Sequence, residues 1–310
     1  MIYMTNDDHQ KIVLFIFAGR QKYMDLQTPY LSKILRSFPA SELHIWNFSR
    51  NDHDNAYLQS LPENLPRTRV FNEYYAGRNE ITTCTKSIGV ICSCTKCRVG
   101  HWSEPYKYYA SRDGEEKTIY VKIDDDILYI DTSRFSVFID SIKSNQKNII
   151  SANVMNNGIC AILNDEVRNF VSYHQLAKKE NFESWWFLCT KVDYFRFAHL
   201  HFLEKKNILI REKLELVSIP RSRFSINTLG FNHEIMKHIA NQLGVEASMN
   251  DEHIISTTCD ILILKGFVTS HFHYSDQRSA INEAEEDYFL DNYRLLAASQ
   301  GEDSSGEERL

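Results

Sequence analysis

The N-terminal part of the chain alternates between short apolar runs and segments with helical spacing. Residues 11–18 (KIVLFIFA) form a continuous apolar run that ends at Gly19, which predicts a strand buried on both faces. The elements predicted next are a helix over residues 23–38, a strand over 42–48, a short helix over 54–61 and a strand over 67–74. This strand–helix–strand alternation indicates a parallel sheet with right-handed crossovers.

The rest of the chain continues the mixture of strands and helices after an irregular stretch at residues 76–102. A strand over 118–126 (TIYVKIDDD) runs directly into three carboxylates. The remaining predicted elements are strands over 148–155 and 266–274, helices over 104–112, 135–144, 231–243, 251–258 and 277–298, and a helical, aromatic-rich stretch over 166–206. The expected fold class is therefore α/β, with a mostly parallel twisted sheet flanked by helices and a C-terminal helix.

No linker or internal repeat divides the chain. We therefore expect a single domain over residues 1–298. The polar, acidic tail over residues 299–310 is expected to be disordered. A chain of 310 residues buries enough apolar surface to fold without a metal or a disulfide.

Charge and cysteine content argue against several classes of protein. The chain has 35 Lys and Arg against 41 Asp and Glu, which gives 35 − 41 = −6; general nucleic-acid binding depends on clustered cations, so we expect none. No apolar run approaches the roughly 20 residues needed to span a bilayer, and residues 1–10 lack the basic start of a signal peptide. The seven cysteines, an odd number, then predict free thiols in a reducing compartment, the cytoplasm.

Four of the cysteines lie close together, at Cys84, Cys92, Cys94 and Cys97. Their spacing permits a zinc site but lacks the two Cys-x-x-Cys pairs that are usual in such sites. Free thiols in a loop are the favoured interpretation, and a zinc-organised interaction protein remains an alternative.

The three consecutive carboxylates are the most informative residues in the chain. Strand geometry places Asp124 and Asp126 on the face of Lys122, and Asp125 on the other face. Two carboxylates about 4 Å apart repel by about 4 kcal/mol at an effective dielectric of about 20, so a divalent cation, a shared proton or open water must offset the repulsion. Ligands bind at the carboxyl ends of strands in open α/β sheets, which favours Mg²⁺ or Mn²⁺.

The alternative is a solvated turn whose Asp residues cap the next helix. The apolar residues on both sides of the acids, in the phrase VKIDDDILYID, argue against that interpretation.

This phrase, some hundred residues after an N-terminal βαβ unit, resembles the Asp-x-Asp metal motif of GT-A fold nucleotide-sugar glycosyltransferases. The resemblance covers residues 11–277 and includes KIVLFIFAGR, ELHIWNFSRNDHDNAYL, RFSIN and SHFHYSDQR. The chain looks like the small single-domain members found in bacteria and large viruses. The resemblance implies a hexosyltransferase-like enzyme that moves a sugar from a nucleoside-diphosphate sugar to a hydroxyl of a glycan or small-molecule acceptor.

The resemblance also assigns roles to particular residues. The implied metal ligands are Asp124, Asp126 and His271, with His273 as an alternative to His271 on the same face. The residues expected to bind the nucleotide sugar are Phe17, Ala18, Gly19, Arg20, Lys122, Asp124, Asp125, Arg223 and Asn227. Arg20 offers a planar fork for a phosphate or a base, although a plain surface arginine is an equally simple interpretation.

An inverting glycosyltransferase needs a general base for the acceptor hydroxyl. Asp251 or Glu252, at the start of a predicted helix, is the candidate, since a helix N-terminus favours an ionised carboxylate; ordinary helix-start charges are the alternative. The aromatic residues at 185–187 and at 194, 195 and 197 are expected in the core rather than in an acceptor cleft.

Two rival functions share these features. A nucleotidyltransferase acting on sugar phosphates also combines acidic residues at a strand end with Mg²⁺, and Ala18–Arg20 would be a minimal phosphate loop for it. A non-catalytic sugar- or protein-binding module on the same fold is the second rival.

Overall fold

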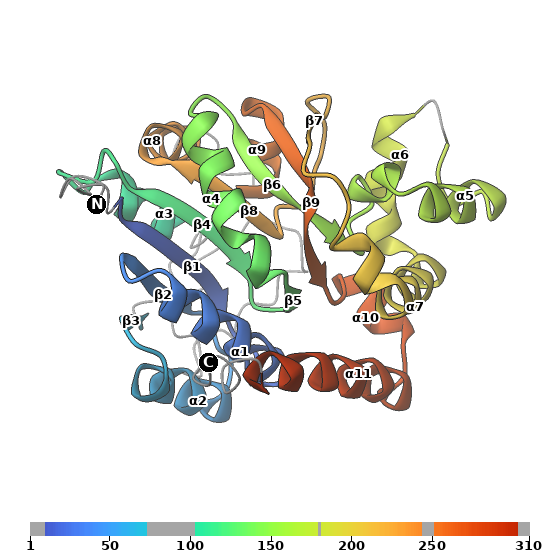
Figure 1. Cartoon of the computed structure of the whole chain (residues 1–310), viewed down its shortest axis with the longest axis horizontal. Coiled ribbons are helices and arrows are strands. Elements are labelled where there is room, and N and C mark those ends of the chain that lie inside the picture. The colour runs from blue at the N-terminus through green and yellow to red at the C-terminus, as the bar shows by residue number, and fades with distance from the viewer. Residues whose placement is uncertain (1–9, 73–102, 179–180, 244–250, 303–310) are drawn as a thin grey trace, which may run out of the picture.

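The computed structural model describes residues 10–72, 103–178, 181–243 and 251–302 (Figure 1). Within them the strands are β1 (Ile12–Ala18), β2 (Ser41–Asn47), β3 (Thr68–Phe71), β4 (Ile119–Asp124), β5 (Ile127–Ile130), β6 (Ile149–Met155), β7 (Leu216–Ser218), β8 (Thr228–Asn232) and β9 (Ile261–His271). They form a single sheet in the order β3-β2-β1-β4-β8-β6-β9-β5, with β7 paired to β9.

The sheet is mixed but mostly parallel, as predicted. β3, β2, β1 and β4 run in one direction. β8 is antiparallel to both β4 and β6, so β6 and its parallel partner β9 return to that direction. β5 and β7 pair antiparallel with β9. The parallel N-terminal part follows from the strand–helix–strand alternation of the sequence.

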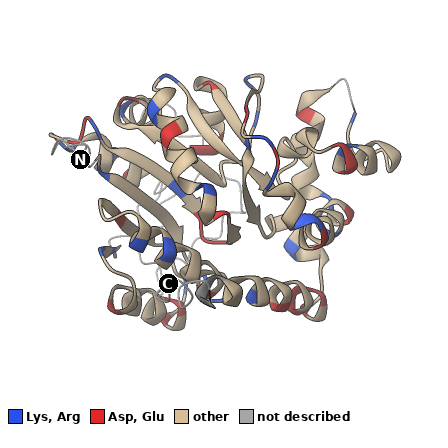
Figure 2. Cartoon of the chain, viewed as in Figure 1, with Lys and Arg blue, Asp and Glu red and all other residues tan. Residues whose placement is uncertain are grey.

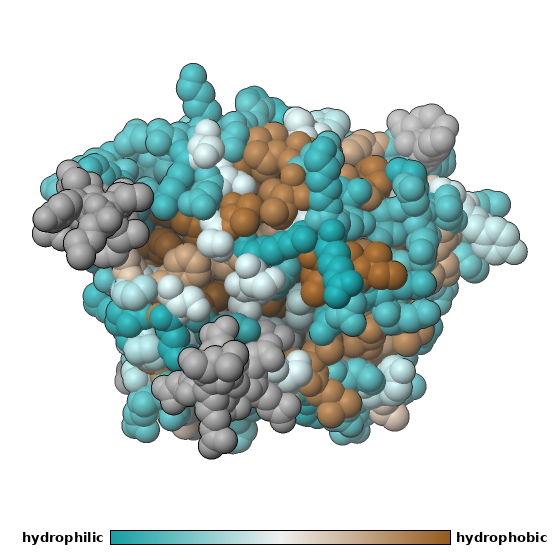
Figure 3. Space-filling view, in the orientation of Figure 1, coloured by the Kyte–Doolittle hydropathy of each residue, from teal (hydrophilic) through white to brown (hydrophobic). Residues whose placement is uncertain are grey.

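Helices cover both faces of the sheet (Figure 1). Among the described residues they are α1 (Gln21–Ser37), α2 (Asp52–Asn64), α3 (Ser103–Ala110), α4 (Phe135–Ser144), α5 (Asp165–Tyr173), α6 (Phe182–Trp186), α7 (Val192–Leu209), α8 (His233–Gln242), α9 (Asp251–Thr258), α10 (Ser275–Ala280) and α11 (Glu283–Glu302). α4 packs on β8, β6 and β9, whereas α8 packs on α3 and on β4 and β8. Hydrophilic residues cover most of the face seen in Figure 3.

Side chains of β8 pack on both faces of the sheet. The sequence analysis did not predict this segment as a strand. Gly230 faces α4, where an added Cβ would lie 2.1 Å from Ile142 Cδ1. The next residue, Phe231, points to the other face and packs near the ring of Phe15, with centroids 6.4 Å apart. The helix predicted from residue 231 therefore begins only at His233, because Phe231 and Asn232 end the strand.

Other element boundaries also differ from the predictions. β9 begins at Ile261 instead of residue 266, and its pairing with β6 shifts register across Gly266. The stretch over 166–206 divides into α5, α6 and α7. α11 begins at Glu283 and ends at Glu302, beyond the predicted helix end at residue 298.

Some predictions concern residues that the structure does not describe. The cysteines at 84, 92, 94 and 97 lie outside the described residues, as does the rest of the predicted tail, residues 303–310. No helix among the described residues is long and apolar enough to cross a bilayer.

α11 lies along α1 near the bottom of Figure 1. The Tyr23 hydroxyl of α1 donates to Glu286 Oε1 of α11 at 2.6 Å, and Lys22 Nζ donates to the same oxygen at 2.5 Å. Tyr23 is fully buried and its hydroxyl also lies 2.8 Å from His273 Nε2. The C-terminal helix thus contacts the segment that directly follows β1.

We expect acid to destabilise the fold through His199. This histidine is fully buried between Tyr293 (Nδ1 to hydroxyl oxygen 2.8 Å) and the carbonyl of Phe272 (Nε2 to oxygen 2.7 Å), and burial lowers its pKa from 6.5 to about 3. The unfolded chain binds a proton below pH 6.5, whereas the folded chain does not until about pH 3. The contribution of neutral His199 to the free energy of unfolding is therefore complete above pH 6.5. It is lost as the pH falls from 6.5 toward 3, by at most about 1.4 kcal/mol per pH unit.

Denaturant titrations between pH 7 and pH 4 measure this dependence. His199→Gln should give a shallower decrease of the unfolding free energy with acid than the wild type. Equal slopes for the two proteins would contradict the assignment.

Candidate metal and donor site

The site lies at the carboxyl ends of β1, β4 and β9. β4 ends at Asp124, and a turn through Asp125 and Asp126 leads into β5; Figure 2 shows this acidic turn in red near the middle of the molecule. β5 pairs with β9 so that Ile127 lies opposite His271. This register brings the acids of the turn next to the last residue of β9.

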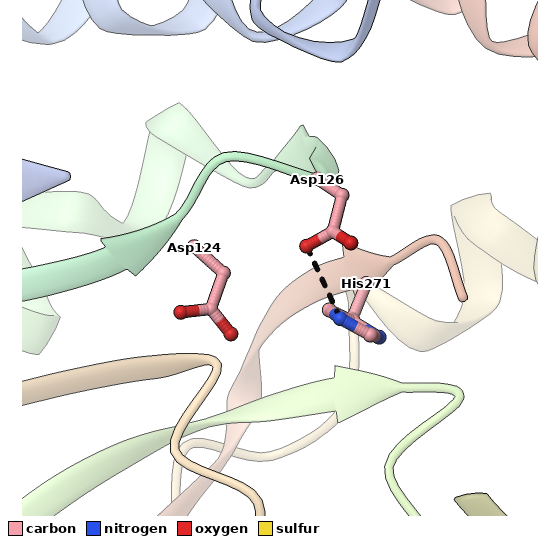
Figure 4. Close-up of side chains that lie close together, drawn as sticks. All are labelled: Asp124, Asp126 and His271. Carbon is pink, nitrogen blue, oxygen red and sulfur yellow. Dashed lines mark ion pairs between the residues drawn. The ribbon is translucent and has the colours of Figure 1, made fainter. Parts of the chain in front are cut away.

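Three predicted ligands lie together (Figure 4). Asp124, Asp126 and His271 each offer one ligand atom, and these atoms all lie within 4.8 Å of one another. His271 Nε2 is 3.2 Å from Asp126 Oδ1, and both side chains are buried, while Asp124 is partly exposed. His273, the alternative, is not part of this group, since its Nε2 faces Tyr23.

These residues fit a hard divalent cation. Around an octahedral ion with bonds of about 2.1 Å, adjacent ligands lie about 3 Å apart and opposite ones about 4.2 Å apart. The spacing of the three ligand atoms therefore needs only small shifts. His271 Nδ1 is buried and has no hydrogen-bond partner among the described residues. Two carboxylates and one imidazole suit Mn²⁺ or Mg²⁺.

Two side-chain cations already offset the repulsion between the acids. Lys122 Nζ forms an ion pair with Asp124 and donates to Ile226 O at 2.8 Å. Arg20 binds Asp125 through Nε (3.1 Å) and Nη2, and its Nη2 donates to Asp126 Oδ2 at 2.9 Å. The sequence analysis assigns Lys122 and Arg20 to the binding of the nucleotide sugar and does not predict their ion pairs with the three acids.

The ionisation of Asp126 follows from its neighbours. Burial opposes the charged form, but the charges of Arg20 and His271 outweigh burial and hold the pKa of Asp126 below its ordinary value. Asp126 is therefore an ionised carboxylate at neutral pH, although it is almost completely buried.

The end of β1 lies directly beside these acids. Phe17 is in register with Asp124 of the neighbouring strand, and Gly19 N donates to Asp125 Oδ2 at 2.9 Å. The Lys122 ammonium lies 5.6 Å from the centre of the Phe17 ring. Ala18 is buried and its carbonyl accepts a hydrogen bond from Phe48 N. The residues predicted at 17–20 thus border the candidate metal centre.

Asp251 and Glu252 open α9, as expected for helix-start acids. Asp251 Oδ2 accepts from the Tyr106 hydroxyl at 3.1 Å. Burial raises the pKa of Asp251 above its ordinary value, although the positive charge of Lys122 opposes the change. Glu252 accepts from Arg223 Nε at 3.1 Å, and burial raises its pKa as well. Both acids therefore lie within electrostatic reach of Asp124, and Glu252 is in addition paired with Arg223.

The aromatic residues divide between core and surface. Trp185, Tyr194 and Phe195 are buried, as predicted. Phe187 is 53% exposed, and Trp186 is partly exposed under the guanidinium of Arg223, whose Cζ lies 3.8 Å from the ring centre. A flat aromatic–guanidinium surface therefore stands next to Glu252.

Sequence reasoning missed several residues that hold the site together. Gln27 Nε2 donates to Asp124 O at 2.8 Å and to Ile127 O at 3.2 Å, and Tyr274 contacts both His271 and Asn227. No local pattern marks these residues, because Gln27 and Ile127 are 100 positions apart and Tyr274 and Asn227 are 47 apart.

No protein-family model matches the sequence, and no curated protein does. Similar solved structures include 4-diphosphocytidyl-2C-methyl-D-erythritol synthase from Anaerococcus prevotii, at 6% identity over 92% of this chain and 96% of that chain, with a TM-score of 0.43. Others are the galactosyltransferase LgtC with donor and acceptor sugar analogs (9%, 93% and 95%, TM-score 0.43) and the mannosyltransferase PcManGT from Pyrobaculum calidifontis with GDP-Man and Mn²⁺ (9%, 97% and 76%, TM-score 0.43).

Proposed function

We propose that this protein is a metal-dependent glycosyltransferase that moves a sugar from a nucleoside-diphosphate sugar to an acceptor hydroxyl. The observation that carries the proposal is the convergence of Asp124, Asp126 and His271 at the carboxyl end of the sheet, beside the end of β1. Ligands of α/β proteins bind at this edge, and two carboxylates there favour a hard cation over a bare phosphate.

Each part of the site has a proposed role. Asp124, Asp126 and His271 would hold Mn²⁺ or Mg²⁺, which neutralises the charge of a departing diphosphate. Lys122 adds a second, buried positive charge beside Asp124. Residues 17–20, at the end of β1, border the nucleotide side of the site.

Asp251 is the proposed general base of an inverting transfer. Its closeness to the positive charge of Lys122 supports the choice over Glu252, whose pKa is also raised but whose opposing cation is Arg223. A base acts best when its pKa lies near the operating pH, and Glu252 is tied to Arg223 by an ion pair. The exposed surface of Trp186 and Arg223 is the proposed acceptor side, because sugars stack on aromatic rings.

The nucleotidyltransferase alternative has less support. It requires the loop after β1 to receive a phosphate, yet Gly19 N and the Arg20 guanidinium are both engaged with Asp125. A phosphate at this loop would have to displace a buried carboxylate from its cation, which costs free energy.

We expect nucleoside diphosphates to stabilise the protein only when a divalent cation, Mn²⁺ or Mg²⁺, is present. Ligand at about 100 times its dissociation constant stabilises the folded state by about 2.7 kcal/mol, which a thermal-denaturation panel of nucleotides and nucleotide sugars detects as a rise in Tm. The panel is run with Mn²⁺, with Mg²⁺ and with chelator. Stabilisation that is equal with chelator and with metal would refute the metal-dependent donor site.

A further inference from the structure

Asn227 connects a candidate metal ligand to the hydrogen-bond network behind the cluster. Its Nδ2 donates to Asp124 Oδ2 at 3.0 Å, while its Oδ1 accepts from Asn157 Nδ2 at 3.1 Å and from the Tyr274 hydroxyl at 3.0 Å. Two donors at Oδ1 fix the orientation of the amide, because a flipped amide would turn its oxygen toward the carboxylate. Asn227 is buried, so the mispaired groups would be costly.

Asn157 is in turn held by the backbone. Its Oδ1 accepts from the amides of Ile159 (3.1 Å) and Cys160 (3.3 Å). This leaves Nδ2 as the donor to Asn227 and to Ser225 O, the latter at 2.9 Å. The orientation of one carboxylate in the cluster is thus set through two buried amides by the main chain.

Tyr274 also contacts the imidazole of the cluster. Its ring lies against the imidazole of His271, with centroids 4.4 Å apart and 40° between the planes. One residue therefore contacts a ligand residue of β9 directly and a ligand residue of β4 through a single amide. β4 and β9 are not neighbours, since β8 and β6 separate them in the sheet.

We propose that Tyr274, acting through Asn227, is a positioning residue that holds Asp124 and His271 in register for a divalent cation. This inference rests on the proposed metal-dependent function. Asn227 Oδ1 already accepts two hydrogen bonds, which is its full capacity. Its Oδ1 therefore cannot accept a hydrogen bond from a sugar hydroxyl while these contacts hold, although Nδ2 can still donate a second hydrogen bond.

Tyr274→Phe tests the proposal, because it removes the hydroxyl and keeps the ring beside His271. Mutation of a group that hydrogen-bonds to a metal ligand typically lowers metal affinity 10–100-fold. Here the Asn227 amide lies between the Tyr274 hydroxyl and Asp124, so we expect an effect at the lower end of that range. We expect the Kd for Mn²⁺, titrated by calorimetry or by the EPR signal of free Mn²⁺, to rise about 10-fold. Asn227→Ala should weaken binding at least as much, and the double variant should add little, because both changes break one chain of contacts.

The matched control is Tyr30→Phe. The Tyr30 hydroxyl is also buried but has no hydrogen-bond partner among the described residues, so its removal should leave the Mn²⁺ affinity unchanged. A merely structural role for Tyr274 would lower the Tm without changing the affinity of the folded protein.

The two levels of the hypothesis fail in different ways. A wild-type protein that binds no Mn²⁺ overturns the metal-dependent function and the positioning role together. Wild-type binding with equal affinity in Tyr274→Phe overturns only the positioning role and leaves the proposed function standing.

Discussion

Asp126→Asn should reduce sugar transfer at least about 10³-fold, because metal stabilisation of a transition state is worth several kcal/mol and each 1.36 kcal/mol is a factor of ten. Asp126 is 3% exposed and contacts both Arg20 and His271. The amide has nearly the same shape, so it removes the charged ligand without opening a cavity. Arg20 retains Asp125 as its partner, which limits the damage to the fold.

Turnover and Mn²⁺ affinity are measured together on this variant. Asp124→Asn is the second variant, because Asp124 is more exposed than Asp126 and the amide oxygen can still accept from Lys122 Nζ; it should lose transfer to a similar degree. Asp140→Asn, at an exposed position of α4, is the control and should transfer normally.

His271→Ala should also weaken Mn²⁺ binding, and its effect should not add to that of Asp126→Asn. Transfer at the wild-type rate in Asp126→Asn would refute the metal centre.

Asp251→Asn should lower turnover 10²–10⁴-fold, the usual effect of losing a general base, and should barely change donor affinity. The base touches the acceptor hydroxyl and not the diphosphate. The same chemistry predicts that turnover falls in acid, because the base must be ionised and the pKa of Asp251 is raised. Removing Asp251 should abolish this acid-side decrease.

Glu252→Gln separates the two helix-start acids. Glu252 is paired with Arg223, so we expect its substitution to affect acceptor binding more than turnover. Proton NMR of the product then gives the anomeric configuration, and we expect inversion. A product that keeps the donor's configuration would falsify the base assignment and return Asp251 to the role of a helix-start charge.

How much of the structure the sequence predicts depends on whether the residues that form each feature are contiguous in the chain. The buried run of β4 and the acids after it are contiguous, so their place at a strand end is readable from pattern alone. β8 is different, because Gly230 interrupts its apolar residues and Asn232 caps the following helix. A five-residue strand that leads straight into a helix has too few positions to display alternation.

The candidate site shows the same limit. Charge repulsion at a strand end points to Asp124 and Asp126, whereas only the resemblance to a family points to His271. The ion pairs of Arg20 with Asp125 and Asp126 join positions more than a hundred residues apart. No single-sequence pattern indicates such pairing, so the sequence could not show that Asp125 and Asp126 hold Arg20.

The contact between α1 and α11 has a consequence for how the protein is made. The Tyr23 hydroxyl binds groups 250 and 263 positions later in the chain, at His273 and Glu286. Contacts between distant positions require large loops to close and slow folding. During synthesis, α1 emerges from the ribosome long before the residues that bury Tyr23. A nascent chain that stops short of β9 carries Asp124 and Asp126 but lacks His271, so we expect the candidate metal site to form only after β9 has been synthesised.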